Sequence, residues 1–344
     1  MKLLMITRKV DAKDPMAGFV YDWAKKLGEK LENLYVITWQ VSQRGDLPAN
    51  IAIYSLPENK LAKIFTLQKK LSQILPKVDG VFCHMNPEYT ILAAPLAKLR
   101  GKKIISWYTH GTVTWRLRLL EKLATIILTA STESFRLSSK KVKVVGHGID
   151  LEKFKFNDRR ERQTIENLIS VGRISPTKDY ESMIKAIDFL VKEGISNLHL
   201  KIIGGPGLPE HKGYFDSLKQ MVVALKLEDK IEFLGPQSPQ EIPQRLARTN
   251  LFINLSGTGS LDKAVLEAMA VGCLVLTSNE AFRSILPPLL MVEQNQPRQL
   301  AEKIKWLRQL PWPEWEKLRI QLRAIIEKNH NLDQLIQKII DQFI

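Results

Sequence analysis

The fold is decided by one stretch in the second half of the chain, SVGRISPTKDY, residues 170–180. A short apolar run leads into it and a helical pattern follows it, with Ser175 expected as the N-cap and Pro176 as the first helical residue. Short apolar strands that alternate with helices are typical of parallel sheets whose faces are covered by helices. This stretch therefore predicts a strand–turn–helix unit of an α/β fold.

The same stretch carries two cations, Arg173 at the strand end and Lys178 in the first helical turn. Parallel sheets present ligands beyond the carboxyl ends of their strands. Arg can clamp two oxygens at once, Lys adds a point charge, and the helix N-terminus favours anions. The pair indicates a diphosphate site, and the alternative is two solvated surface cations.

The strand–helix alternation continues along the whole chain and restarts after a polar run, which predicts two doubly wound α/β units. Two such sheets facing each other would form a cleft. The expected strands are 2–7, 34–39, 51–56, 80–84, 103–108, 125–130, 142–145, 167–172, 198–203, 230–234, 251–255, 273–277 and 289–292.

A chain of 344 residues is too long for one ordinary core. We expect an N-terminal domain over 1–156, a linker over 157–165, a C-terminal domain over 166–312, and closing helices over 313–344 that pack at the domain junction. The apolar runs are too short for a transmembrane helix or a signal-peptide core, which predicts a cytoplasmic protein. Cys83 and Cys273 lie in apolar stretches and are expected to be buried free thiols.

The net charge of +15 is unevenly distributed. Residues 1–155 hold 26 Lys and Arg against 13 Asp and Glu, and the remainder holds 25 against 23. An anionic partner that touches only the first half, or a basic surface kept for solubility, explains this asymmetry. Nucleic acid is not expected as a partner, because no RNP, zinc or helix-turn-helix motif occurs.

A second informative stretch, residues 254–272, runs from a strand through a small-residue loop into a helix. The backbone amides of Gly259, Ser260 and Leu261 are placed to approach an anion. Glu267 lies in an otherwise apolar helical face, where a carboxylate is costly unless it is paired. A ribose diol would suit it, and a structural salt bridge is the alternative.

Weaker signals come from glycines and one histidine at strand ends. Gly204 and Gly205 follow the strand that ends at Ile203, and Gly18 opens the helix after the first strand. His110 follows the strand that ends at Tyr108, and an ordinary loop histidine is its plainer interpretation. The histidine gains weight because it would face the same cleft, and the glycines alone are weak signals, since glycine-rich turns after strands are common.

Together these residues resemble the retaining glycosyltransferases of the GT-B class known as family 4, or glycosyl transferases group 1. The resemblance covers nearly the whole chain and is strongest over 142–280. The matching segments are GIDLEKF at 148–154, VGR at 171–173 with Lys178, IIGGP at 202–206, KIEFLG at 230–235, and LEAMAVG at 266–272.

The resemblance implies two Rossmann-like domains, an N-terminal one for the acceptor and a C-terminal one for a UDP-, GDP- or other nucleotide sugar. Arg173 and Lys178 would neutralise the diphosphate and stabilise the leaving group. Glu267 would hold the ribose and Leu234 would line the base through its backbone. His110 would contact the transferred sugar. Gly18 would let the first loop approach the phosphates.

The resemblance also implies that the reaction needs no metal, because the two cations neutralise the diphosphate. No cofactor is implied besides the donor substrate itself. The sequence departs from the family at one site residue. The family carries another glutamate eight residues before Glu267, and Gly259 stands there in this chain. We expect Asp262 or the amides of residues 259–261 to take over part of its role.

The basic first half has a use in this scheme, because a lipid-linked or cell-envelope glycan acceptor would bring the domain to an anionic membrane surface. The protein would then be peripheral on the cytoplasmic face. Two alternatives share the donor site: a GT-B nucleotide-sugar epimerase, which needs acid and base residues not identified here, and a nucleotide-sugar-binding pseudoenzyme, which fits Gly259.

Overall fold

The computed structural model describes residues 1–14, 18–40, 45–157 and 165–344, so most of the expected linker lies outside the described residues. The chain divides into two compact units. Unit 1 comprises Met1–Asp150 and Asn331–Ile344, and unit 2 comprises Leu151–His330. The end of the first unit thus lies at residue 150 rather than at 156, and the last helix belongs to unit 1.

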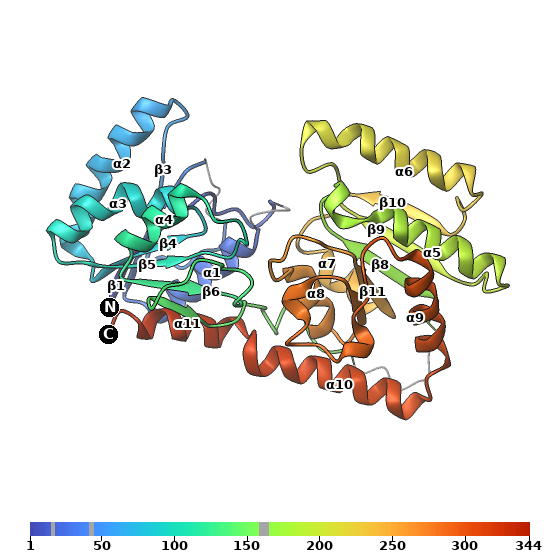
Figure 1. Cartoon of the computed structure of the whole chain (residues 1–344). Coiled ribbons are helices and arrows are strands. Elements are labelled where there is room, and N and C mark those ends of the chain that lie inside the picture. Colours follow the sequence, from blue (N-terminus) through green and yellow to red (C-terminus); the bar gives the residue numbers. More distant parts are fainter. Residues whose placement is uncertain (15–17, 41–44, 158–164) are drawn as a thin grey trace. The chain divides into compact units, whose positions relative to one another are not determined.

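Unit 1 is built on a parallel sheet in the order β3-β2-β1-β4-β5-β6-β7. Helices α2, α3 and α4 cover one face, and α1 and α11 cover the other (Figure 1). The elements are β1 Lys2–Thr7, α1 Gly18–Lys30, β2 Asn33–Thr38, β3 Ile51–Ser55, α2 Lys60–Ile74, η1 Leu75–Lys77, β4 Gly80–His84, α3 Pro87–Leu99, β5 Lys103–Trp107, α4 Trp115–Leu123, β6 Ile126–Thr129, β7 Val142–Val144 and α11 Leu332–Asp341.

Unit 2 is built on a second parallel sheet in the order β10-β9-β8-β11-β12. Helix α5 packs against α6 and α9, and α8 packs against α7 and α10. The elements are β8 Asn167–Val171, η2 Pro176–Lys178, α5 Tyr180–Lys192, β9 His199–Ile203, η3 Pro209–His211, α6 Lys212–Ala224, β10 Ile231–Gly235, α7 Ile242–Ala247, β11 Leu251–Asn254, α8 Lys263–Ala270, β12 Leu274–Thr277, η4 Glu280–Phe282, η5 Pro288–Leu290, α9 Pro297–Gln309 and α10 Trp312–Asn329.

The fold prediction is confirmed: both units are α/β with parallel sheets. The inner strands are almost wholly buried, and the edge strands β3, β7 and β10 are only partly so. Cys83 and Cys273 are buried free thiols, as expected. The strand predicted over 289–292 is wrong. Pro287 and Pro288 lack the N–H that a ladder needs, and the segment forms a 3₁₀ turn followed by a single bridge from Met291 to Thr277.

Helix α11 closes unit 1 from the far end of the chain. Its Asp333 pairs with Lys26 of α1 at 3.0 Å, and the amide of Leu332 donates to the carbonyl of Ile149 at 3.0 Å. Helix α10 is held in unit 2 by the fully buried Arg319, whose guanidinium donates to the carbonyl of Gly272 at 2.8 Å. Within the described residues, no helix is long and apolar enough to cross a membrane.

Candidate functional site

The candidate site lies at the carboxyl edge of the unit 2 sheet. Strands β8, β9, β11 and β12 are parallel, so the loops that follow them leave from the same edge. These loops carry most of the predicted donor-site residues.

Close packing between the loops after β8 and β9 requires a glycine at position 204. Gly204 has φ +140°, and a Cβ there would lie 1.8 Å from the carbonyl oxygen of Gly172. Burial raises the pKa of Tyr180, so its hydroxyl stays protonated and donates to the same carbonyl at 3.5 Å. Gly205 is less constrained, because a Cβ there would lie 3.3 Å from Pro236. The close approach of the Gly172 carbonyl is therefore sufficient to explain why position 204 is a glycine.

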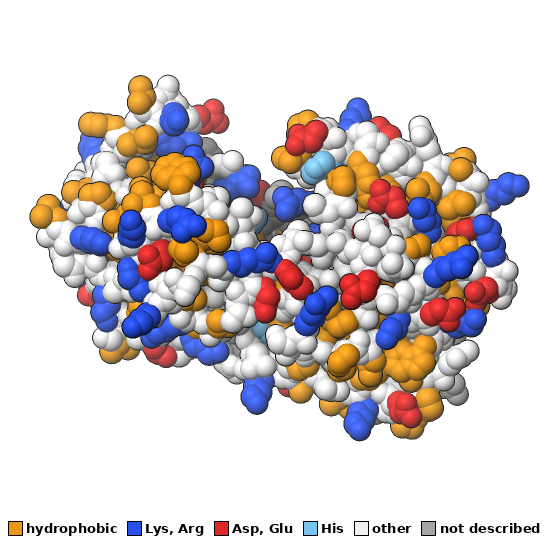
Figure 2. Space-filling model, in the orientation of Figure 1, with side chains coloured by type: hydrophobic (Ala, Val, Ile, Leu, Met, Phe, Trp, Pro, Cys, Tyr) orange, Lys and Arg blue, Asp and Glu red, His pale blue; other side chains and the backbone are white. Residues whose placement is uncertain are grey.

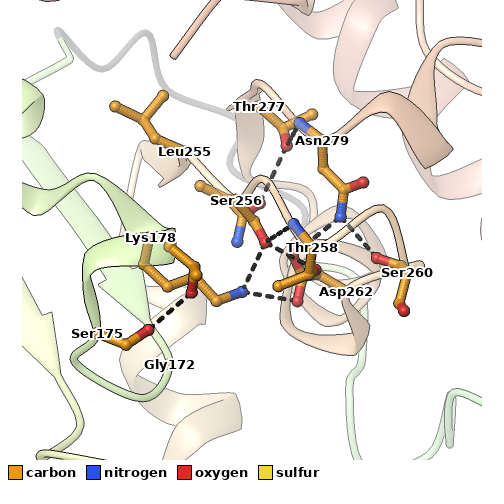
Figure 3. A network of polar contacts seen from close by, with 12 residues as sticks. Gly172, Ser175, Lys178, Leu255, Ser256, Thr258, Ser260, Asp262, Thr277 and Asn279 are labelled. Carbon is orange, nitrogen blue, oxygen red and sulfur yellow. Dashed lines mark hydrogen bonds and ion pairs between the residues drawn. The ribbon is translucent and has the colours of Figure 1, made fainter. Parts of the chain in front are cut away.

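Lys178 ends a 3₁₀ turn, and its side chain points toward the loop after β11 (Figure 3). Its Nζ donates to Oδ1 of Asp262 at 2.8 Å and to Oγ of Ser256 at 3.1 Å. The side chain is only 12% exposed, so this ammonium group is largely removed from water and needs these partners. The structure therefore brings Lys178 and Asp262, two predicted site residues, into direct contact.

The expected N-cap at Ser175 is wrong for the main helix. Ser175 precedes the 3₁₀ turn, makes no side-chain cap there, and its hydroxyl contacts that of Thr177 at 2.9 Å. Helix α5 is capped by Asp179, which has φ +45° and accepts from the amide of Ser182 at 3.3 Å. The Lys178 turn is thus a separate element inserted before the helix.

Asn279, just after β12, fixes the Asp262 carboxylate from the other side. Its Nδ2 donates to Oδ2 of Asp262 at 3.0 Å and to the carbonyl of Ser260 at 2.6 Å, while its Oδ1 accepts from the amide of Ala281 at 3.0 Å. Flipping this amide would place its oxygen against two acceptors, so the orientation is determined by its partners. We call Lys178, Ser256, Asp262 and Asn279 the lysine–carboxylate network (Figure 3).

The loop that contains Gly259 is held by hydrogen bonds to neighbouring loops. Gly259 is buried with φ +64°, and Leu261 is 5% exposed. The amide of Gly257 donates to the carbonyl of Thr177 at 3.1 Å, which joins this loop to the Lys178 turn. The family's glutamate would have to adopt a left-handed backbone here, and non-glycine residues other than Asn and Asp rarely do so.

Arg173 leaves the same sheet edge but does not join the lysine–carboxylate network. Its side chain is exposed and lies beside Gly207, where a Cβ would come within 3.0 Å of its Cδ. Over the described part of the chain it makes no hydrogen bond or ion pair. The guanidinium is therefore available to an incoming anion.

Glu267 lies on α8 with its side chain 13% exposed, and it forms an ion pair with Lys263 one turn earlier. Lys263 also lies over the ring of Phe154 at 5.6 Å. The structural salt bridge that the sequence left open is thus present. Its role toward a ribose stays a prediction.

Leu234 lies at an irregularity in the β9–β10 pairing, where the register shifts between Phe233 and Gly235. Its side chain is half-buried, and its carbonyl accepts from Nε2 of Gln237 at 2.9 Å. The backbone here departs from regular pairing, which fits a segment expected to line a base through its backbone.

Two predicted residues belong to unit 1. Gly18 is the buried first residue of α1, and its amide donates to the carbonyl of Asp14 at 2.8 Å, while residues 15–17 before it lie outside the described residues. His110 is exposed, and its Nδ1 accepts from the amide of Thr112 at 3.2 Å. That hydrogen bond favours the tautomer protonated on Nε2 and leaves Nε2–H to donate.

Sequence reasoning missed Ser256 and Asn279. Both follow the end of a buried strand at the ligand edge, Ser256 after β11 and Asn279 after β12. Polar residues directly after parallel strands are therefore the signal that would have identified them.

The comparisons with known proteins agree with this geometry. The model of the family described as glycosyl transferases group 1 matches residues 152–331, more than half of the chain. The chain belongs to this family. The match contains every predicted donor-site residue of unit 2.

Among curated proteins, mannosylfructose-phosphate synthase of Agrobacterium fabrum is 27% identical over 165 residues, 44% of this chain and 36% of that protein. A putative colanic acid biosynthesis glycosyltransferase of Escherichia coli K12 is 26% identical over 205 residues, 56% of this chain and 48% of that protein. The similarity thus spans less than half the length of these relatives.

Among solved structures, Anabaena HepE in complex with UDP has a TM-score of 0.81 at 15% identity and covers 99% of both chains. The sucrose-phosphate synthase of Thermosynechococcus elongatus has a TM-score of 0.74 at 15% identity and covers 100% of this chain and 98% of its own. At such identities the similarity establishes the fold, which is that of GT-B-like proteins.

Proposed function

We propose that this protein is a retaining glycosyltransferase of family 4 that moves a hexose from a nucleotide diphosphate sugar to an acceptor. One observation carries the proposal: in a chain of this family, two cations leave the carboxyl edge of the unit 2 sheet, one exposed at Arg173 and one held by Asp262 at Lys178. This edge is where parallel sheets bind ligands.

In the proposed reaction the donor diphosphate lies between these two groups. Lys178 then exchanges part of its contact with Asp262 for a phosphate oxygen, and Arg173 binds further oxygens. Both cations stabilise the negative charge that develops on the leaving nucleoside diphosphate. Asp262, freed from one partner and still held by Asn279, is left to accept from a hydroxyl of the transferred sugar.

The remaining donor contacts follow from the resemblance. The Glu267 carboxylate accepts hydrogen bonds from the ribose hydroxyls at the acceptor positions that Lys263 does not use. The backbone near Leu234 lines the base. UDP is the first nucleotide to test, since the Anabaena structural neighbour was solved with UDP. We propose that neither a metal nor a further cofactor is needed, and that His110 of unit 1 contacts the transferred sugar.

The proposed acceptor is a lipid-linked or cell-envelope glycan in polysaccharide biosynthesis, bound by unit 1 on the cytoplasmic face of the membrane. Two observations support it: the excess of Lys and Arg in residues 1–155, and a relative described as acting in colanic acid biosynthesis. An anionic carrier lipid would be attracted by that charge.

The donor site is tested by calorimetric titration of UDP, GDP and their sugars in the presence of EDTA. Lys178→Ala and Arg173→Ala are each expected to weaken binding of the preferred nucleotide about tenfold or more, because each removes a charge-assisted contact. Lys185→Ala, an exposed lysine on α5, is the matched control and should bind like the wild type. Unchanged binding by both site variants would exclude this site.

A nucleotide-sugar-binding pseudoenzyme is the second candidate, favoured by Gly259 with its left-handed backbone. The glycosyltransferase and the pseudoenzyme are distinguished by measuring donor hydrolysis and sugar transfer once donor binding has been established. Asp262→Ala should abolish turnover and keep nucleotide binding if Asp262 contacts the sugar. A wild-type protein that binds a donor tightly and turns over none, with or without acceptor, supports the pseudoenzyme.

A further inference from the structure

The first two turns of α2 carry large apolar side chains that the core of unit 1 does not use. Leu61 is 80% exposed, Phe65 is 73% exposed and Ile64 is 37% exposed. Positions i, i+3 and i+4 lie on one helix face. The residues that α2 buries all belong to its second half: Leu67, Leu71 and Ile74.

The charge of α2 indicates what kind of partner this face would meet. The helix holds four lysines and no acidic residue. Lys60 and Lys63 lie in its first turn, where the helix dipole disfavours cations, so local helix stability does not explain them. Cations at these positions favour an anionic partner.

A second apolar group lies at the start of α4. Trp115 is 67% exposed and Val113 is 36% exposed. The guanidinium of Arg116 lies 5.2 Å from the Trp115 ring and 3.5 Å from the carboxylate of Glu88, an exposed pair of small energetic weight. Trp beside Arg is typical of residues that lie at a membrane–water interface.

The topology places both groups on one side of unit 1. Helices α2 and α4 follow the parallel strands β3 and β5 and both pack against α3, so both begin at the carboxyl edge of the sheet and on the same face. Strands β3 and β5 are separated by β2, β1 and β4, which puts the two groups roughly 20 Å apart. Figure 2 shows hydrophobic side chains interspersed with Lys and Arg over this part of unit 1.

We propose that this α2–α4 surface, formed by Leu61, Ile64, Phe65, Val113 and Trp115 with Lys60, Lys63 and Arg116, docks on an anionic lipid bilayer. Two separated apolar groups, each with basic residues beside it, fit a broad, flat, negatively charged partner better than a single binding groove. Leu and Phe insert among the acyl chains, and the cations bind the headgroups. The functional role of this docking rests on the proposed function, in which the acceptor is carried by the membrane.

Vesicle flotation with the full chain and no donor or acceptor tests the proposal. The protein should float with vesicles of phosphatidylcholine and phosphatidylglycerol and remain at the bottom with phosphatidylcholine alone. Leu61→Ser/Phe65→Ser and Lys60→Gln/Lys63→Gln should each lower the bound fraction about tenfold, because both the apolar and the charged contributions are needed. All four positions are accessible and none is buried, so the variants should fold.

Leu99→Ser is the matched control. Leu99 is 82% exposed in the same unit but ends α3, at the opposite edge of the sheet, and its variant should float like the wild type. Equal recovery with neutral and anionic vesicles, or an equal loss in Leu99→Ser, overturns the proposal. So does self-association that Leu61→Ser/Phe65→Ser abolishes without any vesicle binding. Nucleotide binding, measured separately, stays intact if only the docking proposal fails.

Discussion

Asn279 and Asp262 are joined by a 3.0 Å hydrogen bond from the Asn279 side-chain amide to the carboxylate, and Asn279 is fully buried. The same amide nitrogen donates to the carbonyl of Ser260 at 2.6 Å. Asn279 thus fixes both the carboxylate that meets Lys178 and the loop that precedes it.

Asn279→Ala is expected to destabilise the fold by about 1–3 kcal/mol, since it leaves buried acceptors without a donor. It should also raise KM for the donor, because the loop and the carboxylate lose their common support. Asn279→Asp keeps the shape but sets a second carboxylate against Asp262. It should become progressively less stable as the pH rises and the two groups ionise. Urea denaturation and donor kinetics measure both effects, and wild-type values in both variants would remove Asn279 from the site.

Gly259→Glu restores the glutamate that the family carries at this position. Because Gly259 has φ +64°, a side chain there is expected to cost about 1 kcal/mol of folding stability and not to raise transfer activity. Gly259→Ala separates the backbone cost from the carboxylate and should show a similar loss of stability. A marked gain of activity in Gly259→Glu would show instead that the loop readily adopts the usual family conformation.

Glu267 and its partner Lys263 provide a matched pair of variants. If Glu267 holds the ribose, Glu267→Gln should weaken UDP binding about tenfold, the cost of one charge-assisted hydrogen bond. Lys263→Gln removes the same ion pair but no ribose contact. Because both side chains are mostly buried, it should lower stability by about 1–3 kcal/mol and leave UDP affinity close to normal. Equal effects of both variants on affinity would assign Glu267 to a structural role.

His84 predicts a pH dependence of stability in unit 1. It is fully buried at the end of β4, its Nε2 has no partner among the described residues, and burial lowers its pKa to about 3. The unfolded chain binds this proton below about pH 6.5 while the folded chain does not, so stability falls as the pH falls. Denaturation at about pH 7 and about pH 5 should differ by about 2 kcal/mol from this group. His84→Asn should remove most of that difference, and an unchanged pH dependence would contradict the assignment.

The fold was largely predictable from the sequence, because buried parallel strands appear as short apolar runs between helical patterns. The exceptions have local causes. The run at 289–292 is as apolar as a strand, but the two prolines before it prevent regular pairing. Ser175 and Pro176 have the composition of a helix start, yet the helix begins only after Asp179 adopts a left-handed conformation.

The candidate site was predictable in part. Lys178 was identified from its position after a strand end, and Asp262 as the carboxylate expected to replace the family's glutamate at Gly259; the structure brings the two side chains together. Their contact was not predictable, because it depends on the loops after β8 and β11 meeting in space. The contact between Asn279 and Asp262 was not predictable for the same reason, although the position of Asn279 directly after β12 was a sequence signal for the ligand edge.

The return of α11 to unit 1 means that the chain passes between the two units twice, near residue 150 and near residue 330. Unit 2 is therefore an insertion within unit 1, and no continuous N-terminal fragment contains the whole first unit. Phe343 packs so closely on Gly80 that a Cβ there would lie 2.4 Å from its ring. Deleting the last helix would thus uncover the sheet at the opposite end of the sequence, and proteolysis near the C-terminus should loosen the N-terminal unit first.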